Sequence, residues 1–444
     1  MESNARFTAY KVLLKIEEEQ GYSSLSLNNA VKEDNLSPLD VAFATALVYG
    51  VLERKLTIDY ILSKFIKLPK HKISTEVFTI LRLGVFQIIF MDKIPVSAAV
   101  NECVNIAKSQ KLFNATGFIN GVLRSIARTN NAYTLPRKNN YPFYLSIKYS
   151  CPQDLIKLSL NHFGEEMTIN ILESFSDRPN LTARVNTLKT TSEQLIYDLN
   201  NIFVMAEKCD GIPDALNLKN TGSIESLETF QKGEFHIQDG ASQLCAHALN
   251  PKAGMTVLDV CAAPGGKSFT IAELMSNQGE IYSFDLYQNK LNLISDESYR
   301  LGIKIIKTKK RNAQISQDQL PMADRILCDV PCSGLGVIRR KPEIRYKPDF
   351  GLRSLPNIQY EILCNSARFL KQGGIMVYST CTWNPRENGE VANRFLAEHS
   401  DFAAQPLNLP EKFKSVLNEP ENQLTLFPHV HGTDGFFISA FTKI

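Results

Sequence analysis

The chain has 444 residues, of which 44% are hydrophobic and 21% charged, and its formal net charge is +3. This composition is typical of folded globular proteins and excludes a disordered, collagenous or low-complexity chain. One compact core rarely holds more than about 250 to 300 residues, so we expect two or three domains. The small positive charge does not by itself indicate a nucleic-acid partner.

The sequence predicts a cytoplasmic location. The longest apolar stretch, residues 83–91, is too short to cross a bilayer, and the N-terminus lacks the pattern of a signal peptide. The nine cysteines are an odd number without CxxC pairs, which favours reduced thiols over a disulfide framework or a zinc site. His429 and His431 have no acidic or cysteine partner at a ligand spacing, so we assign no metal.

Hydrophobic periodicity and composition divide the chain into segments. Apolar residues follow a helical period through residues 1–130, which predicts an all-helical domain. Residues 131–142 are polar and contain prolines, as a linker does. Residues 143–235 combine a helical stretch, 153–163, with an expected strand, 181–188, and predict a small α+β subdomain.

Residues 236–444 alternate β-rich runs with longer helical segments. The expected strands are residues 256–261, 280–286, 303–307, 324–330 and 374–379. This alternation predicts a Rossmann-like α/β domain with a doubly wound parallel sheet. Ligands of such sheets bind at the carboxyl ends of the strands.

A turn with two glycines follows the first of these strands. Gly265 and Gly266 would let a ligand approach the backbone beside a helix N-terminus, although a turn with incidental glycines is the alternative. The motifs for ATP and NAD are absent. The candidate binding residues at this turn are Cys261, Ala262, Ala263, Pro264, Gly265, Gly266 and Lys267.

Three further strand ends carry polar or reactive side chains. Asp285 lies at the end of the second strand, where a carboxylate can accept hydrogen bonds from two ribose hydroxyls. Cys332 and Cys381 follow the fourth and fifth strands. A single buried cysteine is most often a packing residue. Two thiols at adjacent strand ends, with Asp329 close before one of them, instead indicate a reaction centre.

These motifs resemble the RNA cytosine-5 methyltransferases that use S-adenosylmethionine. The similarity lies in CAAPGGK, DVPCSG, STC and the terminal DGFF, in this order within residues 230–444, with further matches at residues 184–186, 238–239 and 242–243. Residues 5–128, especially 82–84 and 119–124, resemble the helical RNA-binding domain of the antitermination factor NusB. Together they are similar to the RsmB (Sun) subgroup, which modifies small-subunit ribosomal RNA.

The resemblance implies methyl transfer from S-adenosylmethionine to carbon 5 of a cytosine in 16S ribosomal RNA, with residues 143–235 as an RNA-recognition subdomain. It assigns Cys381 as the nucleophile that adds to carbon 6, Cys332 to release of the carbon 5 proton, and Asp329 to nitrogen 3 of the base and to the cofactor. Cys381 must then be partly ionised, and Lys267 is a candidate to promote this.

One segment departs from the family. After the third strand the family carries an acidic residue that contacts adenine, whereas here Asn312 is the substitute, and we expect weaker cofactor binding. Two basic clusters are expected on loops near the reaction centre, where phosphates could dock, although a solvated charged face is the alternative. The clusters are Lys304, Lys307, Lys309, Lys310 and Arg311, and Arg339, Arg340, Lys341, Arg345 and Lys347. Arg184 is a further expected RNA contact.

Two other functions stay open. One is methylation of transfer RNA, against which the helical domain argues only by analogy. The other is a non-catalytic RNA-binding or ribosome-assembly factor, suggested by the basic residues 309–311, although both cysteines are retained. For Trp383 the sequence leaves two interpretations equally open: it lines a base pocket, or it caps the core.

Overall fold

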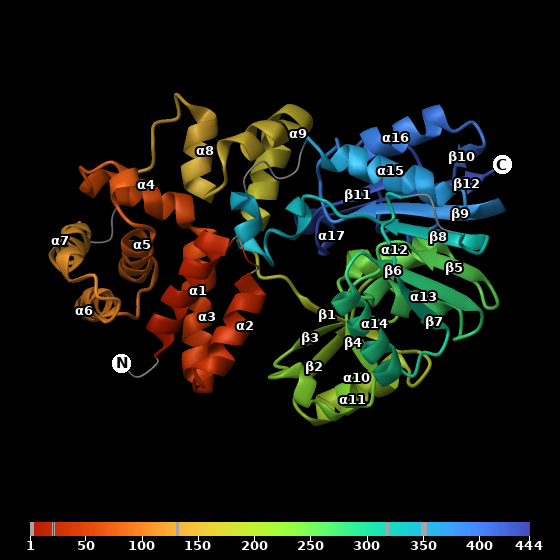
Figure 1. The fold of residues 1–444 in the computed structure, drawn as a ribbon, viewed down its shortest axis with the longest axis horizontal. Coiled ribbons are helices and arrows are strands. Elements are labelled where there is room, and N and C mark those ends of the chain that lie inside the picture. Colours follow the sequence, from red (N-terminus) through yellow and green to blue (C-terminus); the bar gives the residue numbers. More distant parts are fainter. Residues whose placement is uncertain (1–3, 20, 22, 130–132, 316–318, 348–352) are drawn as a thin grey trace. The chain divides into compact units, whose positions relative to one another are not determined.

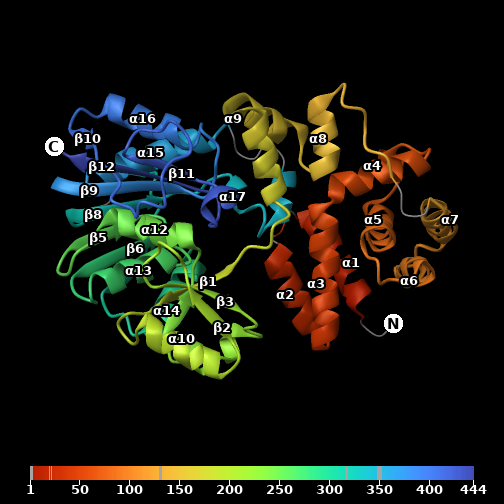
Figure 2. The same ribbon diagram turned by 180° about the vertical axis from the view of Figure 1, so that it is seen from behind.

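The computed structural model describes residues 4–19, 21, 23–129, 133–315, 319–347 and 353–444. The chain forms two compact units, shown in Figures 1 and 2. Unit 1 comprises residues 1–177 and 338–348, and unit 2 comprises residues 178–337 and 349–444. Within the described residues, no helix combines the length and the apolar character that a membrane span requires.

Unit 1 is helical, as expected. Its first seven α-helices are α1 (Ala5–Glu19), α2 (Ser23–Glu33), α3 (Pro38–Glu53), α4 (Lys55–Phe65), α5 (Thr75–Phe90), α6 (Val96–Ser109) and α7 (Thr116–Ala127). Helix α5 is buried along most of its length and forms the centre of the core. A Cβ atom at Gly84 of α5 would lie 2.6 Å from the Leu123 side chain of α7. The two NusB-like segments of the sequence therefore pack against each other through this glycine.

Helices α8 (Tyr141–Tyr149) and α9 (Gln153–Ser174) also belong to unit 1. The Thr57 hydroxyl donates to the Ile147 carbonyl oxygen at 2.6 Å, and the backbone N–H of Leu56 donates to the Ser150 hydroxyl at 2.9 Å. The division between the units therefore falls at residue 177, later than the boundary expected at 142. Residues 130–132 of the expected linker lie outside the described residues.

The segment 338–348 is part of unit 1 although it lies between two strands of unit 2 in the sequence. The Glu343 carboxylate accepts hydrogen bonds from the backbone N–H of Ser23 at 3.0 Å and from its hydroxyl at 2.8 Å. Glu343 thereby caps the N-terminus of α2. The Tyr346 hydroxyl donates to the carbonyl oxygen of Leu52 at 2.7 Å. Buried polar contacts thus anchor this segment to the helices.

Unit 2 begins with a four-stranded antiparallel sheet in the order β2-β3-β1-β4. Its strands are β1 (Leu181–Val185), β2 (Met205–Lys208), β3 (Ala215–Lys219) and β4 (Phe235–Ile237), accompanied by α10 (Ser192–Asn201) and α11 (Glu228–Gln231). The expected small α+β subdomain is present. Strand β1 is shorter than the predicted strand 181–188. The helical part of the expected subdomain, residues 143–177, belongs to unit 1 instead.

The second sheet of unit 2 positions the candidate site. Parallel strands lie in the order β9-β8-β5-β6-β7, with bounds β5 (Thr256–Asp259), β6 (Glu280–Asp285), β7 (Ile306–Lys310), β8 (Ala323–Asp329) and β9 (Leu370–Thr380). Strand β12 (Phe436–Lys443) pairs antiparallel with β9, and β10 (Phe402–Ala404) and β11 (Gln423–Leu426) pair with β12. The sheet is therefore mixed rather than wholly parallel.

Helices cover both faces of this sheet (Figure 1). One face packs against α12 (Gly240–Leu249), α13 (Gly266–Leu274) and α14 (Gln288–Leu301). The other packs against α15 (Leu355–Ala367) and α16 (Gly389–Glu398), and the short α17 (Pro428–His431) precedes β12. The expected third strand, 303–307, begins three residues later as β7.

Candidate active site

Cys332 and Cys381 lie together at the carboxyl ends of β8 and β9. These strands are parallel neighbours, with Asp329 opposite Ser379. The two sulfur atoms are 3.0 Å apart, and the backbone N–H of Cys381 donates to the Cys332 sulfur at 3.2 Å. Both side chains are half-buried thiols. The structure thus brings together the two cysteines that the sequence places at one edge of the sheet.

The two thiols have different surroundings. The hydrogen bond with the Cys381 sulfur and burial raise the pKa of Cys332 well above its usual range, and the nearby Glu387 carboxylate acts in the same direction. Cys332 is therefore protonated near neutral pH. Its S–H group can donate a hydrogen bond to the Cys381 sulfur.

Lys267 and Asp329 form an ion pair beside the cysteines. The Lys267 ammonium lies 2.8 Å from Asp329 Oδ2, and the Ser379 hydroxyl donates to Asp329 Oδ1 at 2.8 Å. Burial alone would lower the pKa of Lys267, but the Asp329 carboxylate outweighs burial and raises it. Lys267 is thus a fixed cation, and both oxygens of Asp329 are engaged by neighbouring side chains.

The glycine turn joins β5 to α13 in a form that excludes a side chain at Gly265. Its φ angle is 109°, and a Cβ atom there would lie 2.5 Å from the Phe269 ring. The turn, residues 261–265, is held at its start by the hydrogen bond from the Ala262 N–H to the Phe284 carbonyl oxygen at 2.7 Å. The carboxyl end of β6 is therefore joined directly to the turn.

Asp285 ends β6, and Asn312 follows β7, on this same edge of the sheet. Asp285 is half-buried, and its Oδ1 accepts the Tyr287 N–H at 3.0 Å. The Arg311 N–H donates to the Asp285 carbonyl oxygen at 3.0 Å, which places Asn312 one residue beyond this contact. Asn312 Oδ1 accepts the Gln314 N–H at 3.0 Å and thereby shapes the turn after β7. A glycine turn with a carboxylate on the next strand fits a ligand that carries a ribose.

Asp259 is a site residue that sequence reasoning missed. It ends β5, is 1% exposed, and accepts the Ser268 hydroxyl at 2.6 Å through Oδ2. Its Oδ1 is buried and has no hydrogen-bond partner among the described residues. Burial raises the pKa of Asp259 to about 7. An acidic residue at the end of an otherwise apolar strand, directly before the glycine turn, is a signal that could have identified it.

The outlying motifs of the sequence converge on this site. Asp239 Oδ1 accepts the Asp434 N–H at 3.1 Å. The Gly435 N–H donates to the Gly336 carbonyl oxygen at 2.9 Å, so the DGFF segment lies against the loop that follows Cys332. The Lys267 ammonium lies 5.0 Å from the centre of the Phe436 ring. Segments separated by about 200 residues of chain therefore assemble around the cysteine pair.

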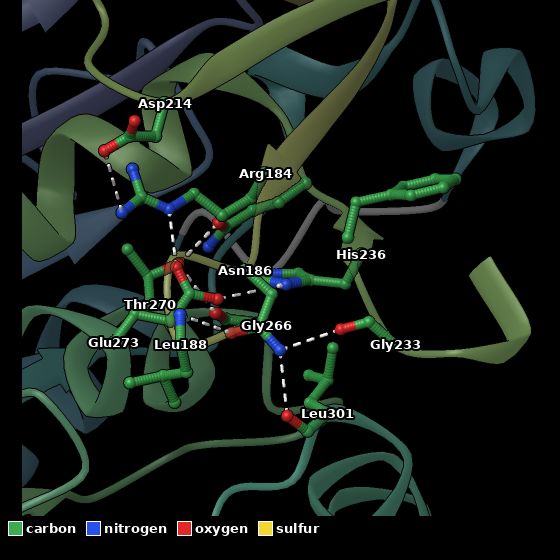
Figure 3. Close-up of polar contacts among 12 residues, drawn as sticks. Arg184, Asn186, Leu188, Asp214, Gly233, His236, Gly266, Thr270, Glu273 and Leu301 are labelled. Atoms are coloured by element: carbon green, nitrogen blue, oxygen red, sulfur yellow. Dashed lines mark hydrogen bonds and ion pairs between the residues drawn. The ribbon is translucent and has the colours of Figure 1, made fainter. Parts of the chain in front are cut away.

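Arg184 is placed differently from the expectation that it contacts RNA. It is 1% exposed, and its guanidinium donates to Glu273 Oε2 at 2.7 Å (Figure 3). It also donates to the Pro213 carbonyl oxygen at 2.7 Å. Burial raises the pKa of Glu273 to about 7, although Arg184 opposes this shift. The guanidinium is therefore held in a buried network between β1 and α13, and the expectation that Arg184 contacts RNA is wrong.

The first basic cluster does not lie on a loop near the cysteines. Most of it is in or beside β7, which is the edge strand, with β6 and β5 between it and β8. Lys307 is paired with Glu280 at 2.5 Å. Arg311 is buried, with its guanidinium 5.6 Å from the centre of the Phe284 ring. Exposed Lys309 and Lys310 remain at the sheet edge.

The second basic cluster belongs to the segment anchored in unit 1. Arg345 is 1% exposed, and its Nη1 lies 3.3–3.4 Å from the carbonyl oxygens of Glu53, Tyr149 and Ser150. It therefore stabilises the ends of α3 and α8 and does not face solvent for phosphate docking. Arg339, Arg340 and Lys341 are half-buried.

Trp383 and His431 form hydrogen bonds with the backbone of neighbouring segments. Trp383 is buried, and its indole N–H donates to the Leu335 carbonyl oxygen at 3.0 Å, which supports the core interpretation. His431 Nδ1 accepts the Phe427 N–H at 3.0 Å. Across the described part of the chain, no group of three or more His, Cys, Asp or Glu side chains is arranged to hold a metal ion.

Family models match three consecutive parts of the chain. They are the NusB family at residues 3–128, the RsmF/B-like ferredoxin-like domain at residues 151–225, and the 16S rRNA methyltransferase RsmB/F at residues 246–442. The first and third matches correspond to the expected helical and α/β domains.

Two relatives match the chain over nearly its whole length. The chain is 40% identical to the probable ribosomal RNA small subunit methyltransferase B of Bacillus subtilis (strain 168), over 99% of both chains. It is 34% identical to the protein of the same name from Synechocystis sp., again over 99% of both chains.

Known structures have the same fold. The crystal structure of PH0851 matches 100% of both chains, with 26% identity and a TM-score of 0.84. A methyltransferase homologue from Pyrococcus horikoshii covers 68% of this chain and 99% of its own, with 29% identity and a TM-score of 0.61.

Proposed function

The chain belongs to the RsmB/F family of 16S rRNA methyltransferases, and we propose that it transfers a methyl group from S-adenosylmethionine to carbon 5 of a cytosine in 16S ribosomal RNA. The observation that carries the proposal is the 3.0 Å contact between the Cys332 and Cys381 sulfur atoms. Carbon 5 of cytosine becomes nucleophilic only after a thiolate adds to carbon 6, and its proton must then be removed. Two adjacent thiols can supply these two functions.

The residues of the glycine turn fit the cofactor. Gly265 gives the turn a backbone conformation that packs against Phe269, and Asp285, at the end of the next strand, would accept hydrogen bonds from ribose hydroxyls. Asn312 would accept a hydrogen bond from the adenine amine without the help of a negative charge. The turn residues Cys261, Ala262, Ala263, Pro264, Gly266 and Lys267 complete this binding set, to which Asp329 would also contribute. When bound, the cofactor supplies a methyl group on a sulfonium.

Cys381 acts first in the proposed reaction. Its thiolate adds to carbon 6 of the cytosine, which forms a carbon–sulfur bond and moves electron density toward nitrogen 3 of the ring. Asp329, held by Lys267 at 2.8 Å, would meet nitrogen 3. After taking up a proton from solvent, it would deliver or share the proton that balances this charge. Carbon 5 is then able to accept the methyl group.

Cys332 acts second. Once Cys381 is bonded to carbon 6 it is an uncharged thioether, and the hydrogen bond that most strongly raises the pKa of Cys332 is lost. Cys332 can then release its own proton to solvent, and the resulting thiolate takes the proton from carbon 5. The electron pair of that bond restores the ring double bond, and the bond from carbon 6 to sulfur breaks with release of the Cys381 thiolate. Cys332 is thus protonated at rest and becomes a base when it is needed.

RNA binding involves further residues in this proposal. Arg339, Arg340 and Lys341 would contact phosphates, because they follow the Cys332 loop closely in the sequence. The target cytosine would be turned out of its stack so that its ring can reach the cysteines. Ribosomal RNA is the substrate class that the names of the full-length relatives support.

The test is incubation of the protein with methyl-labelled cofactor and 16S ribosomal RNA from cells that lack the protein. We expect labelled 5-methylcytosine in digests of the RNA, measured by mass spectrometry of nucleosides. Transfer RNA from the same cells is the parallel substrate, and label there alone would assign the other substrate class. RNA binding by folded protein without any transfer would favour a non-catalytic factor.

A further inference from the structure

Glu387 is a fully buried carboxylate that binds the residue directly after Cys332. It lies in the loop between β9 and α16, six residues after Cys381, and is 0% exposed. Oε2 accepts the Ser333 N–H at 2.8 Å and the Gln359 side-chain amide at 2.9 Å. Oε1 accepts the Ser333 hydroxyl at 2.5 Å and the Asn384 side-chain amide at 2.8 Å. All of these donors are neutral.

These bonds fix the backbone on both sides of Cys332. Ser333 follows Cys332 directly, and its N–H is bound by the Glu387 carboxylate. Pro331 precedes Cys332, and its carbonyl oxygen accepts the Gln359 amide at 3.0 Å from the same nitrogen that donates to Glu387. One carboxylate thus holds, directly and through Gln359, the two residues that flank the Cys332 sulfur.

The same residue is tied to the segment that carries Cys381. The Tyr378 hydroxyl, from β9, donates to the Glu387 carbonyl oxygen. Asn384, three residues after Cys381, donates to the carboxylate. Next to Glu387, Asn388 donates through its side-chain amide to the Thr382 carbonyl oxygen at 3.0 Å. Glu387 therefore connects the two loops whose cysteines are in contact.

The chemistry of this position favours an acid for a specific reason. Burying a carboxylate among neutral donors costs free energy, which a buried apolar side chain would avoid. A carboxylate, however, accepts hydrogen bonds at both oxygens, and here each oxygen meets one N–H donor and a second donor. A glutamine could keep the Ser333 N–H and Gln359 bonds through its one oxygen, if the Ser333 hydroxyl and the Asn384 amide turned to accept from its NH₂ group.

We propose that Glu387 is a positioning residue that holds Cys332 beside Cys381, so that Cys332 can take the carbon 5 proton and the covalent RNA adduct can break down. The inference rests on the proposed function, because it concerns the second half of that reaction. Removal of Glu387 is expected to spare addition of Cys381 to the base and to slow release of the methylated RNA. The negative charge of Glu387 also helps to keep Cys332 protonated at rest.

The experiment follows one turnover with an RNA fragment that contains the target cytosine. Formation and decay of the protein–RNA adduct are measured on denaturing gels, and methyl transfer is measured by label. For Glu387→Ala we expect adduct formation within a few-fold of wild type and decay about ten- to hundredfold slower. Glu387→Gln should restore decay to near the wild-type rate, since it can retain the bond to the Ser333 N–H.

Two further variants make the result specific. Glu390→Ala removes an exposed acid three residues away and should leave both rates unchanged. Gln359→Ala removes the link to Pro331 and should slow decay without removing Glu387. A thermal melt shows whether Glu387→Ala folds. If it does not fold, the decay rate of Gln359→Ala tests the positioning role instead.

The outcomes separate this inference from the proposed function. Equal loss of formation and decay in folded Glu387→Ala and Gln359→Ala, or decay in Glu387→Gln as slow as in Glu387→Ala, would overturn the positioning role. Absence of methyl transfer by wild type, or absence of an adduct with Cys332→Ala, would instead overturn the proposed function itself.

Discussion

The sulfur atoms of Cys332 and Cys381 lie 3.0 Å apart, each on the loop that follows one of two neighbouring parallel strands. A disulfide bond is about 2.05 Å long, so only a small approach separates the two thiols from a covalent link. We predict that mild oxidation with diamide joins them, abolishes methyl transfer, and is reversed by dithiothreitol. Peptide mass spectrometry would identify the cross-linked pair.

The control for this prediction is Cys332→Ser, which should prevent the cross-link. Cys364 is also half-buried and serves as an internal reference for access of the reagent. Oxidation that modifies Cys364 but leaves Cys332 and Cys381 unlinked would contradict the observed contact.

Asp259 predicts a pH dependence of stability. Burial raises its pKa from an ordinary value of 3.8 to about 7, so the folded protein binds this proton more tightly than the unfolded chain. The contribution of Asp259 to stability is therefore greatest below pH 4 and is lost as the pH rises to about 7. Asparagine does not titrate, so Asp259→Asn lacks this loss. As the pH rises from 4 to 7, the free energy of unfolding of Asp259→Asn should therefore increase relative to that of wild type by up to about 4 kcal/mol.

Denaturant unfolding of both proteins at several pH values measures this difference, and the other titrating groups cancel in the comparison. A difference between wild type and Asp259→Asn that stays constant from pH 4 to pH 7 would show that Asp259 is ionised in the folded protein throughout.

Arg340 predicts a change in the salt dependence of RNA binding. If it contacts a phosphate, Arg340→Gln should weaken binding to RNA of any sequence and reduce the slope of log affinity against log salt by about 0.7 to 0.9. The control is Lys414→Gln, which removes an exposed charge paired with Glu411 in unit 2. Filter binding at a series of salt concentrations gives both slopes, and an unchanged slope for Arg340→Gln would remove it from the RNA-binding residues.

Glu343 predicts a local effect on α2. Its carboxylate satisfies the backbone N–H and the hydroxyl of Ser23, and loss of such a cap costs about 1 to 2 kcal/mol. Glu343→Ala should therefore increase hydrogen exchange of the α2 amides by about five- to thirtyfold. Glu33→Ala, at the exposed end of the same helix, is the control. Exchange that rises equally in both variants would argue against the cap.

Much of the candidate site follows from the sequence because parallel strands end at a common edge. The alternation of strands with helices, together with the cysteines after residues 329 and 380, predicts that the two thiols lie close together, and they do. The glycine turn was likewise identifiable, because two adjacent glycines follow an apolar strand. The structure adds that Gly265 is required by its packing against Phe269.

The basic residues show where sequence reasoning fails. Arg184, Arg311 and Arg345 were expected at RNA, yet all are buried. Residue type gives the charge of a side chain but not its partner, and Glu273 is 89 positions from Arg184. Glu387 escaped notice for the same reason, since the groups that hold it come from the loop after β8, from β9 and from α15 as well as from its own loop. The antiparallel β12 was also missed, because strand direction depends on tertiary pairing.

The central claim is a covalent bond between Cys381 and the target cytosine that Cys332 helps to break. The most direct measurement is the intact mass of Cys332→Ala after reaction with cofactor and the ribosomal RNA fragment. We predict a stable protein–RNA adduct that carries one added methyl group and is absent when Cys381 is also replaced by alanine. Full methyl transfer by Cys381→Ala, with no adduct in Cys332→Ala, would contradict the account.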